Sequence, residues 1–122
     1  MIVGCGVDVV EVGRMRRAGE RFGRRLLERI FTPAEIAYVE RKKNRWERYA
    51  ARFAAKEAGM KAIGTGLRGG VRWKDFEVSN AASGKPTLRL HGAAGRIASR
   101  LGVREVHLSL THTRDSAAAV VI

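Results

Sequence analysis

Residues 48–62, RYAARFAAKEAGMKA, constrain the fold of this chain more than any other stretch, because they predict a long helix with three different faces. At about 100° per residue, one face is apolar and carries Trp46, Tyr49, Ala50, Phe53 and Met60. A second face consists only of alanine and can pack closely against a neighbouring element: Ala51, Ala54, Ala55, Ala58 and Ala62. The third face is expected to be polar and carries Arg48, Arg52 and Lys56.

Glu57 does not fit this pattern, since it projects from the middle of the apolar face. An unpaired charge buried in a protein costs several kcal/mol, on the order of the whole stability of a small domain. We therefore expect that Glu57 has a partner or that its part of the helix lines a cleft.

The length of 122 residues predicts a single domain over residues 1–122, with a modest core. No apolar run is long enough to cross a membrane, and the first residues lack the features of a secretory signal. The single cysteine, Cys5, excludes an internal disulfide and fits a reducing compartment. We therefore expect a cytoplasmic protein that does not bind membranes.

Positive charge dominates the composition, with 24 Lys and Arg residues against 12 Asp and Glu residues and a net charge of +12. Residues 13–52 hold 13 of the basic residues and 5 of the acidic ones, a net charge of +8. Such a patch attracts an anionic partner, which can be a nucleic acid, an acidic protein or a phosphorylated small molecule. The alternative is an arginine-rich composition spread over solvated helix faces.

The N-terminal half predicts one strand followed by three helices. Residues 1–10 are rich in β-branched side chains and glycine and favour a strand. Residues 13–30 predict a basic helix whose apolar side consists of Met15, Phe22, Leu26 and Ile30. A second helix begins at Thr32, the expected N-cap, with Pro33 in its first turn and Glu35 completing a capping box.

The C-terminal half predicts mainly antiparallel strands. Residues 72–78 and 85–90 form two strands around a turn-rich segment, and residues 103–113 and 117–122 form a closing hairpin. A short helix over 93–102 is expected to direct two apolar side chains inward, Ile97 and Leu101. The predicted fold class is therefore α+β, with an antiparallel sheet packed on the long helix.

Asp8 is unusual in the first predicted strand, because aspartate is disfavoured in strands. Alternation along the strand places Asp8 on the same face as Gly4 and Gly6, which leave room for a bulky group. Alone, Asp8 is best interpreted as the partner of an arginine. Together with Glu57 it could hold one Mg²⁺ ion, since Mg²⁺ uses one or two carboxylates and completes its shell with waters and substrate phosphates.

Three basic side chains of the long helix could supply charge for the same phosphates: Arg52, Lys56 and Lys61. For Lys61 the alternative is an ordinary ion pair with Glu57 one turn earlier, worth only a few tenths of a kcal/mol.

The two histidines near the C-terminus lie on opposite faces of the predicted strand, so they cannot bind one metal ion together. His107 shares its face with Ser109 and Thr111, whereas His112 follows an apolar line. A histidine on an apolar line is usually a core residue with a hydrogen-bond partner, although near the hairpin turn His112 can also face a ligand.

Four motifs occur in a fixed order along the chain: GVDVVEV at the N-terminus, RFAAKEAGMKA in the long helix, SGKP in the turn and LSLTHT near the end. With these motifs the chain resembles the holo-[acyl-carrier-protein] synthases, the small bacterial 4′-phosphopantetheinyl transferase family. The resemblance covers nearly the whole chain and implies the fold of that family.

The resemblance also implies a reaction. Asp8 and Glu57 would bind Mg²⁺, which bridges the pyrophosphate of coenzyme A. A serine hydroxyl of apo acyl carrier protein attacks the β-phosphate, the phosphopantetheine arm is transferred, and adenosine 3′,5′-bisphosphate leaves; the product carrier serves fatty acid biosynthesis. Lys61 would steady the charge on the transferred group. The base that takes the serine proton is a metal-bound water or, as the second choice, a side chain.

The resemblance further implies binding residues and an assembly. The nucleotide phosphates would be held by Arg52, His112 and Thr113, and the adenosine part would lie beside Gly84, Lys85 and Pro86. Family members are typically trimers with coenzyme A between subunits. The acidic carrier protein would be received by arginines of the first helix: Arg14, Arg17, Arg21, Arg24 and Arg25.

Two other function classes compete with this interpretation. A basic RNA- or DNA-binding module explains the net charge, but it gives no reason for Asp8 and Glu57, which repel phosphate without a metal. It would also present aromatic residues on a sheet, whereas Trp73 and Phe76 are expected in the core. An Mg²⁺-dependent phosphohydrolase shares the metal site but does not need the basic helix. We therefore expect no nucleic-acid partner.

Overall fold

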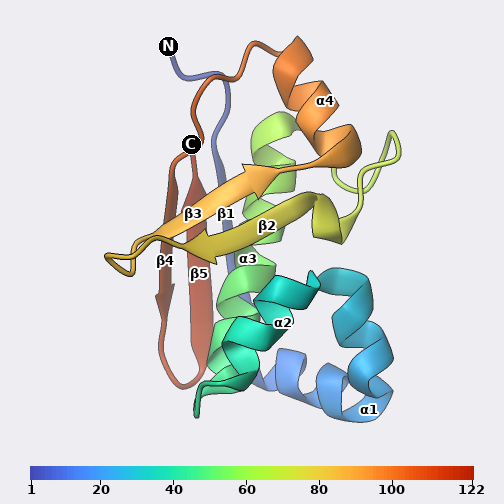
Figure 1. Ribbon diagram of the computed structural model, residues 1–122, viewed down its shortest axis with the longest axis vertical. Helices are drawn as coiled ribbons and strands as arrows, with labels where there is room; N and C mark the ends of the chain where they lie inside the picture. Colours follow the sequence, from blue (N-terminus) through green and yellow to red (C-terminus); the bar gives the residue numbers. More distant parts are fainter.

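The computed structural model describes all 122 residues and has the α+β architecture expected from the sequence (Figure 1). The elements follow in the order β1 (Gly6–Glu11), α1 (Val12–Ile30), α2 (Pro33–Glu40), α3 (Arg45–Ile63), β2 (Phe76–Asn80), β3 (Pro86–Leu90), α4 (Gly92–Arg100), β4 (Leu108–His112) and β5 (Ser116–Val121). A short 3₁₀ turn, Trp73–Asp75, precedes β2. The order of predicted elements is thus confirmed. None of the helices combines the length and the apolar character needed to span a membrane.

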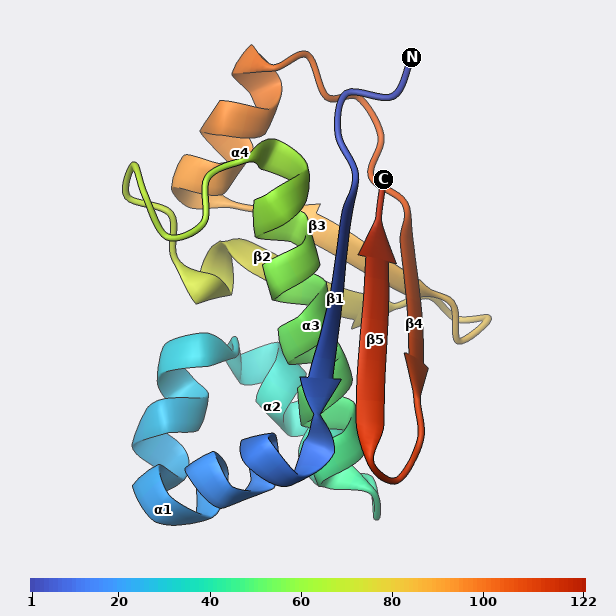
Figure 2. The same cartoon turned by 180° about the vertical axis from the view of Figure 1, so that it is seen from behind.

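The main sheet is antiparallel and has the strand order β1-β5-β4, so β1 and β4 are its two edges. In its register Asp8 lies opposite Ala119 of β5, and Leu110 of β4 lies opposite the same alanine. The strands β2 and β3 form a separate antiparallel hairpin. Figure 2 shows the main sheet from the side opposite α3, where no other element covers it.

The helix α3 packs unusually close to β1, as its alanine face predicted. A Cβ atom added to Gly6 would lie 1.9 Å from the carbonyl oxygen of Ala58, and one added to Gly4 would lie 1.9 Å from that of Ala62. Only glycine fits at such distances. The bulky group for which the glycines of β1 leave room is therefore α3 itself.

Two positions depart from the predicted apolar faces. Phe22 is 58% exposed, and Leu101 is also exposed instead of pointing inward. The cause at Phe22 is a kink in α1 at Gly23, whose φ of 67° and ψ of −154° are not helical. After the kink Leu27, and not Leu26, is buried, so the period that linked Phe22 to Leu26 is interrupted.

The expectation of a polar face on α3 at Arg52 and Lys56 is wrong. Arg52 is 3% exposed and Lys56 is fully buried, because α2 and the β2–β3 hairpin pack over that side of the helix. The capping box of α2 is confirmed: Thr32 accepts a hydrogen bond from the backbone N–H of Glu35, whose side chain accepts one from the backbone N–H of Thr32. The same Glu35 carboxylate is the buried partner of Lys56, at 2.8 Å.

Candidate functional site

Asp8, one of the two carboxylates predicted to bind a metal, lies on β1 at the edge of the sheet and is paired with Lys61 of α3. The Nζ atom of Lys61 lies 3.1 Å from Oδ1 of Asp8 and donates a second hydrogen bond of 3.1 Å to the carbonyl oxygen of Val7. Asp8 is half-buried, whereas the Lys61 side chain is 55% exposed. The partner of Asp8 is thus a lysine and not the arginine considered from the sequence, and Lys61 hydrogen-bonds to Asp8 and not to Glu57.

Glu57 completes this cluster and explains why a carboxylate occupies the apolar face of α3. Partial burial raises the pKa of Glu57, and the charge of Asp8 raises it further, while Lys61 lowers it in part. Two carboxylates therefore lie close enough to repel each other, and one exposed lysine compensates them incompletely. No group of three or more His, Cys, Asp or Glu side chains in the structure could hold a metal ion. A cation at Asp8 and Glu57 would thus need a substrate phosphate and waters as its other ligands, a donor set that fits Mg²⁺.

A second group of predicted residues lies at the opposite edge of the sheet, at the end of β4. His112 Nδ1 lies 2.9 Å from Oε1 of Glu47, and both side chains are half-buried. The hydroxyl oxygen of Thr113 accepts hydrogen bonds from the backbone N–H groups of Asp115 and Ser116 and so shapes the β4–β5 turn. His112 follows the inward line of β4, as predicted.

The turn between β2 and β3 contains Gly84 and Lys85 and ends at Pro86, the first residue of β3. It lies on the β4 side of the molecule in both Figure 1 and Figure 2. Gly84 has a φ of 91°, a conformation that favours glycine. Its carbonyl oxygen accepts a hydrogen bond from the side-chain amide of Asn80, at 3.1 Å. Lys85 is exposed.

Arg52 is connected to this turn from the protein interior, through Asn80. Its Nη2 atom donates a 2.7 Å hydrogen bond to Oδ1 of Asn80, and its guanidinium lies over the ring of Tyr38, 4.5 Å from the centroid. Its Nε atom is buried without a hydrogen-bond partner. Arg52 is thus beneath the surface and reaches the predicted nucleotide site through Asn80.

The structure does not bring Lys56 to either group of residues. Its ammonium donates hydrogen bonds to Glu35 and to the backbone carbonyl oxygens of Trp73 and Phe76. All three of its protons therefore have acceptors inside the protein. Lys56 connects α3 to α2 and β2, and no part of it is available to a phosphate.

The two groups are separated within one chain. Asp8 is on β1 and His112 is on β4, with β5 between them. Neighbouring strands lie roughly 5 Å apart, so the two edges are about 10 Å apart, and His112 lies two residues further along the ladder than the partner of Asp8. A ligand that contacts both groups in one chain would have to cross the sheet.

The basic helix α1 follows β1 directly, so that it begins four residues after Asp8. The five arginines predicted to receive a carrier protein are all exposed: Arg14, Arg17, Arg21, Arg24 and Arg25. Phe22 adds an exposed aromatic ring to this surface, with the guanidinium of Arg21 5.2 Å from its centroid. The predicted apolar periodicity of α1 assigned Phe22 to the core. The sequence signal against that assignment is Gly23, where the helix is kinked.

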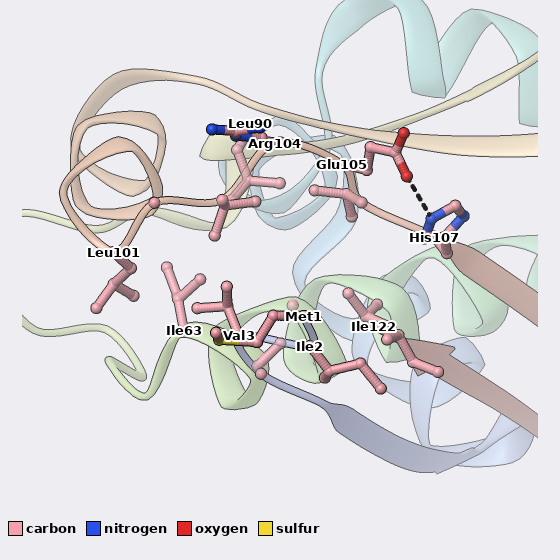
Figure 3. Close-up of a pocket in the computed structure, with 17 residues that line it drawn as sticks. Met1, Ile2, Val3, Ile63, Leu90, Leu101, Arg104, Glu105, His107 and Ile122 are labelled. Carbon is pink, nitrogen blue, oxygen red and sulfur yellow. Dashed lines mark hydrogen bonds and ion pairs between the residues drawn. The ribbon is translucent and has the colours of Figure 1, made fainter.

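A pocket of about 650 Å³ lies at the end of α3 away from α1, between the N-terminal residues and the segment that joins α4 to β4 (Figure 3). Its lining is mostly apolar and includes Ile2, Val3, Ile63 and Ile122. None of the site residues predicted from the sequence lines this pocket. The predicted site therefore lies outside this pocket, on the polar surface at the two sheet edges.

Two further residues of the site region have no signal in the sequence. Glu47 contacts His112, which is 65 positions away in the chain. Asn80 contacts Arg52, which is 28 positions away. Both are ordinary polar residues near the end of an element, and only the tertiary fold shows their partners.

Comparison with known proteins identifies relatives over the full chain. The 4′-phosphopantetheinyl transferase superfamily matches residues 4–121. The chain is 65% identical to the holo-[acyl-carrier-protein] synthase of Solibacter usitatus, over 100% of this chain and 98% of that protein. The crystal structure of holo-[acyl-carrier-protein] synthase from Neisseria meningitidis has a TM-score of 0.90 at 36% identity, covering 99% of this chain and 97% of the other. The Bacillus anthracis enzyme in complex with CoA (3′,5′-ADP) has a TM-score of 0.81 at 37% identity, covering 99% and 95%.

Proposed function

The chain belongs to the holo-[acyl-carrier-protein] synthases of the 4′-phosphopantetheinyl transferase superfamily, and from this membership we propose how its own residues perform the reaction. The reaction transfers 4′-phosphopantetheine from coenzyme A to a serine of apo acyl carrier protein and releases adenosine 3′,5′-bisphosphate, and it is linked to fatty acid synthesis. We infer that the polar cluster of Asp8, Glu57 and Lys61 is the catalytic centre.

Asp8 and Glu57 would hold Mg²⁺ against the pyrophosphate of coenzyme A. When bound, the ion supplies a Lewis acid and a template for the transferred phosphoryl group. The raised pKa of Glu57 supports this role, because a divalent cation relieves the repulsion between the two carboxylates. Both carboxylates approach from elements that are locked together by the contact between Gly6 and Ala58, so their spacing is fixed before the substrate arrives.

Lys61 would stabilise the negative charge of the transferred group. Its side chain is mostly exposed, and its ammonium is already held at the cluster by Asp8 and the carbonyl oxygen of Val7. A preorganised cation of this kind needs little reorganisation during the reaction, and charge stabilisation is usually the largest contribution to catalysis.

The nucleotide end of coenzyme A would lie at the β4 edge. His112 and Thr113 would contact its phosphates, and Lys85, with Gly84 and Pro86, would lie beside its adenosine part. Arg52 would hold this surface in shape through Asn80. We leave Lys56 out of the phosphate-binding set, because its ammonium is fully buried and paired.

The separation of the two sheet edges leads us to propose a homotrimer with coenzyme A between subunits. The β1 edge of one subunit would supply the carboxylates and Lys61, and the β4 edge of the next would supply His112. The uncovered face of the sheet suits such an assembly, since it presents the exposed apolar side chains of Val7, Val9 and Val120. A cyclic assembly would bury this face in each subunit.

The acidic carrier protein would bind to the arginines of α1. Because α1 follows β1 without a loop, a carrier held there would bring its serine close to Asp8. Complementary charge on exposed side chains mainly increases the rate at which the two proteins associate. Coenzyme A and this carrier define a reaction in the cytoplasm, which is the compartment that we propose.

The single observation that carries the proposal is the cluster of two carboxylates and a lysine beside the exposed basic helix. The test is to incubate the protein with coenzyme A, Mg²⁺ and an apo carrier protein, and to weigh the carrier by mass spectrometry. We expect a gain of one phosphopantetheine, which Glu57→Gln abolishes. Hydrolysis of coenzyme A without a change in the carrier would indicate a phosphohydrolase and contradict the proposal.

A further inference from the structure

The pair formed by His112 and Glu47 connects the end of β4 to the first turn of α3. The two side chains are 28% and 25% exposed, so the hydrogen bond of 2.9 Å is partly shielded from water. The chain has two other histidine–carboxylate pairs, and in both the imidazole is more exposed: His91 with Glu77 at 3.0 Å, 43% and 20% exposed, and His107 with Glu105 at 3.2 Å, 65% and 78% exposed. The environment thus distinguishes the pair at the β4–β5 turn from an incidental surface contact.

The chemistry of this pair determines the state of the imidazole. An ionised carboxylate only accepts hydrogen bonds, so Nδ1 of His112 must carry the proton that it donates to Glu47. The other ring nitrogen, Nε2, has no hydrogen-bond partner in the protein. The orientation of the ring and the nitrogen available to a ligand are therefore both set by Glu47, as a second partner commonly sets them for histidines that bind metals or substrates.

We propose that Glu47 is a positioning residue for the nucleotide phosphates of coenzyme A, acting through His112. The carboxylate holds the Nδ1 proton, directs Nε2 away from the protein towards a phosphate oxygen, and stabilises the imidazolium that forms a charge-assisted hydrogen bond to that oxygen. This inference rests on the proposed function, since it takes the ligand of His112 to be a phosphate. Glu47 itself touches neither the phosphate nor the reacting atoms.

The contrast with Glu57 makes the inference specific. Both glutamates lie on α3, but the charge of Asp8 acts on Glu57, whereas Glu47 reaches His112 at the β4 edge. The loss of Glu57 should stop the chemical step. The loss of Glu47 should instead weaken binding of the nucleotide and leave the turnover of bound substrate nearly unchanged.

The first test is the tautomer of His112, read from two-dimensional ¹H–¹⁵N spectra of the whole protein at a pH where the ring is neutral. We expect the Nδ1–H tautomer in the wild type and in Glu47→Gln, whose amide oxygen still accepts the hydrogen bond. Glu47→Ala should lose this preference. The matched control is Glu105→Ala, which should leave His112 unchanged. An Nε2–H tautomer in the wild type would overturn the proposal.

The second test is binding of adenosine 3′,5′-bisphosphate, measured by titration calorimetry. Glu47→Ala should weaken binding about tenfold, the loss of roughly one charge-assisted hydrogen bond, and raise KM for coenzyme A to a similar extent with a change in kcat below about threefold. Glu47→Gln should be intermediate, because it keeps the acceptor and loses the charge. In a background of His112→Gln, Glu47→Ala should have no further effect.

These outcomes separate this inference from the proposed function. Additive effects of Glu47→Ala and His112→Gln, or a fall in kcat with unchanged KM, would overturn the positioning role while transfer to the carrier continues. A wild-type protein that transfers phosphopantetheine but does not bind adenosine 3′,5′-bisphosphate would overturn it as well. A protein that modifies no carrier would contradict the proposed function, and the tautomer would still report whether Glu47 fixes His112.

Discussion

Replacement of Lys56 by methionine should cost the protein much of its stability and leave coenzyme A binding nearly unchanged. The sequence placed this lysine among the phosphate-binding residues, whereas the structure holds it between α3, α2 and β2. Its ammonium has three acceptors, the carboxylate of Glu35 and the carbonyl oxygens of Trp73 and Phe76. Methionine keeps the apolar stem but removes the charge and all three hydrogen bonds.

The magnitude follows from the burial of the pair. Lys56 and Glu35 are both 0% exposed, and the removal of one partner of a buried ion pair costs about 3–5 kcal/mol, because the other charge remains in the interior. Glu35 would keep only its hydrogen bonds from the backbone N–H groups of Thr32 and Val78. A second substitution, Glu35→Gln, removes the stranded charge and retains an acceptor, so the double variant should recover about 2 kcal/mol relative to the sum of the single changes.

Urea denaturation of the three variants at one fixed protein concentration measures these differences, since the apparent stability of the proposed trimer would depend on concentration. KM for coenzyme A is then determined under conditions in which each variant is folded. A Lys56→Met variant that stays within about 1 kcal/mol of the wild type and raises KM tenfold would refute this reasoning and return Lys56 to the phosphate site.

Three further predictions concern the catalytic cluster and the basic helix. Glu57→Gln should abolish transfer without unfolding the protein. In the wild type, the Mg²⁺ concentration for half-maximal rate should increase as the pH falls through the raised pKa of Glu57, because a protonated carboxyl does not bind the ion. A requirement for Mg²⁺ that is independent of pH would contradict the ligand role. Lys61→Met should reduce kcat with little change in Tm, whereas a loss of Tm with normal kinetics would indicate a structural role. Charge reversal at Arg14, Arg21 and Arg24 should raise KM for the carrier severalfold and flatten its salt dependence without affecting KM for coenzyme A; equal weakening of both would place the helix in the nucleotide site.

The features that follow from local periodicity were predictable from the sequence. Alternation in β1 and the turn of α3 placed Asp8 and Glu57 on faces where a carboxylate is unexpected, and in the folded chain the charge of Asp8 raises the pKa of Glu57. The alanine face of α3 predicted close packing against a neighbouring element, and the structure shows that this element is β1 at its glycines. Each of these inferences needs only one element and its period.

The features that depend on how elements cover one another were not predictable. Lys56 lies on a helix face that is basic in sequence, and only the packing of α2 and the β2–β3 hairpin makes it a core residue. Phe22 was assigned to the core because the period of α1 was continued through Gly23, where the backbone leaves the helix. The pairing of Glu47 with His112 joins residues 65 positions apart, beyond the reach of any local pattern.

The site shared between subunits is the central claim, and it is tested most directly by mixing two variants that are each impaired at a coenzyme A concentration well below the KM of His112→Gln. Glu57→Gln lacks the metal half of the site, and His112→Gln lacks the phosphate half. Mixed trimers, formed by co-expression of both variants, are incubated with coenzyme A, Mg²⁺ and apo carrier protein, and the modified carrier is measured by mass. An intact site needs the metal half from a His112→Gln chain and the phosphate half from a neighbouring Glu57→Gln chain. With equal amounts of both variants, about one quarter of the interfaces should have this arrangement, and activity should return to about that fraction of the wild type. Activity no greater than that of the separate variants would show that each chain builds its site alone and would contradict the account.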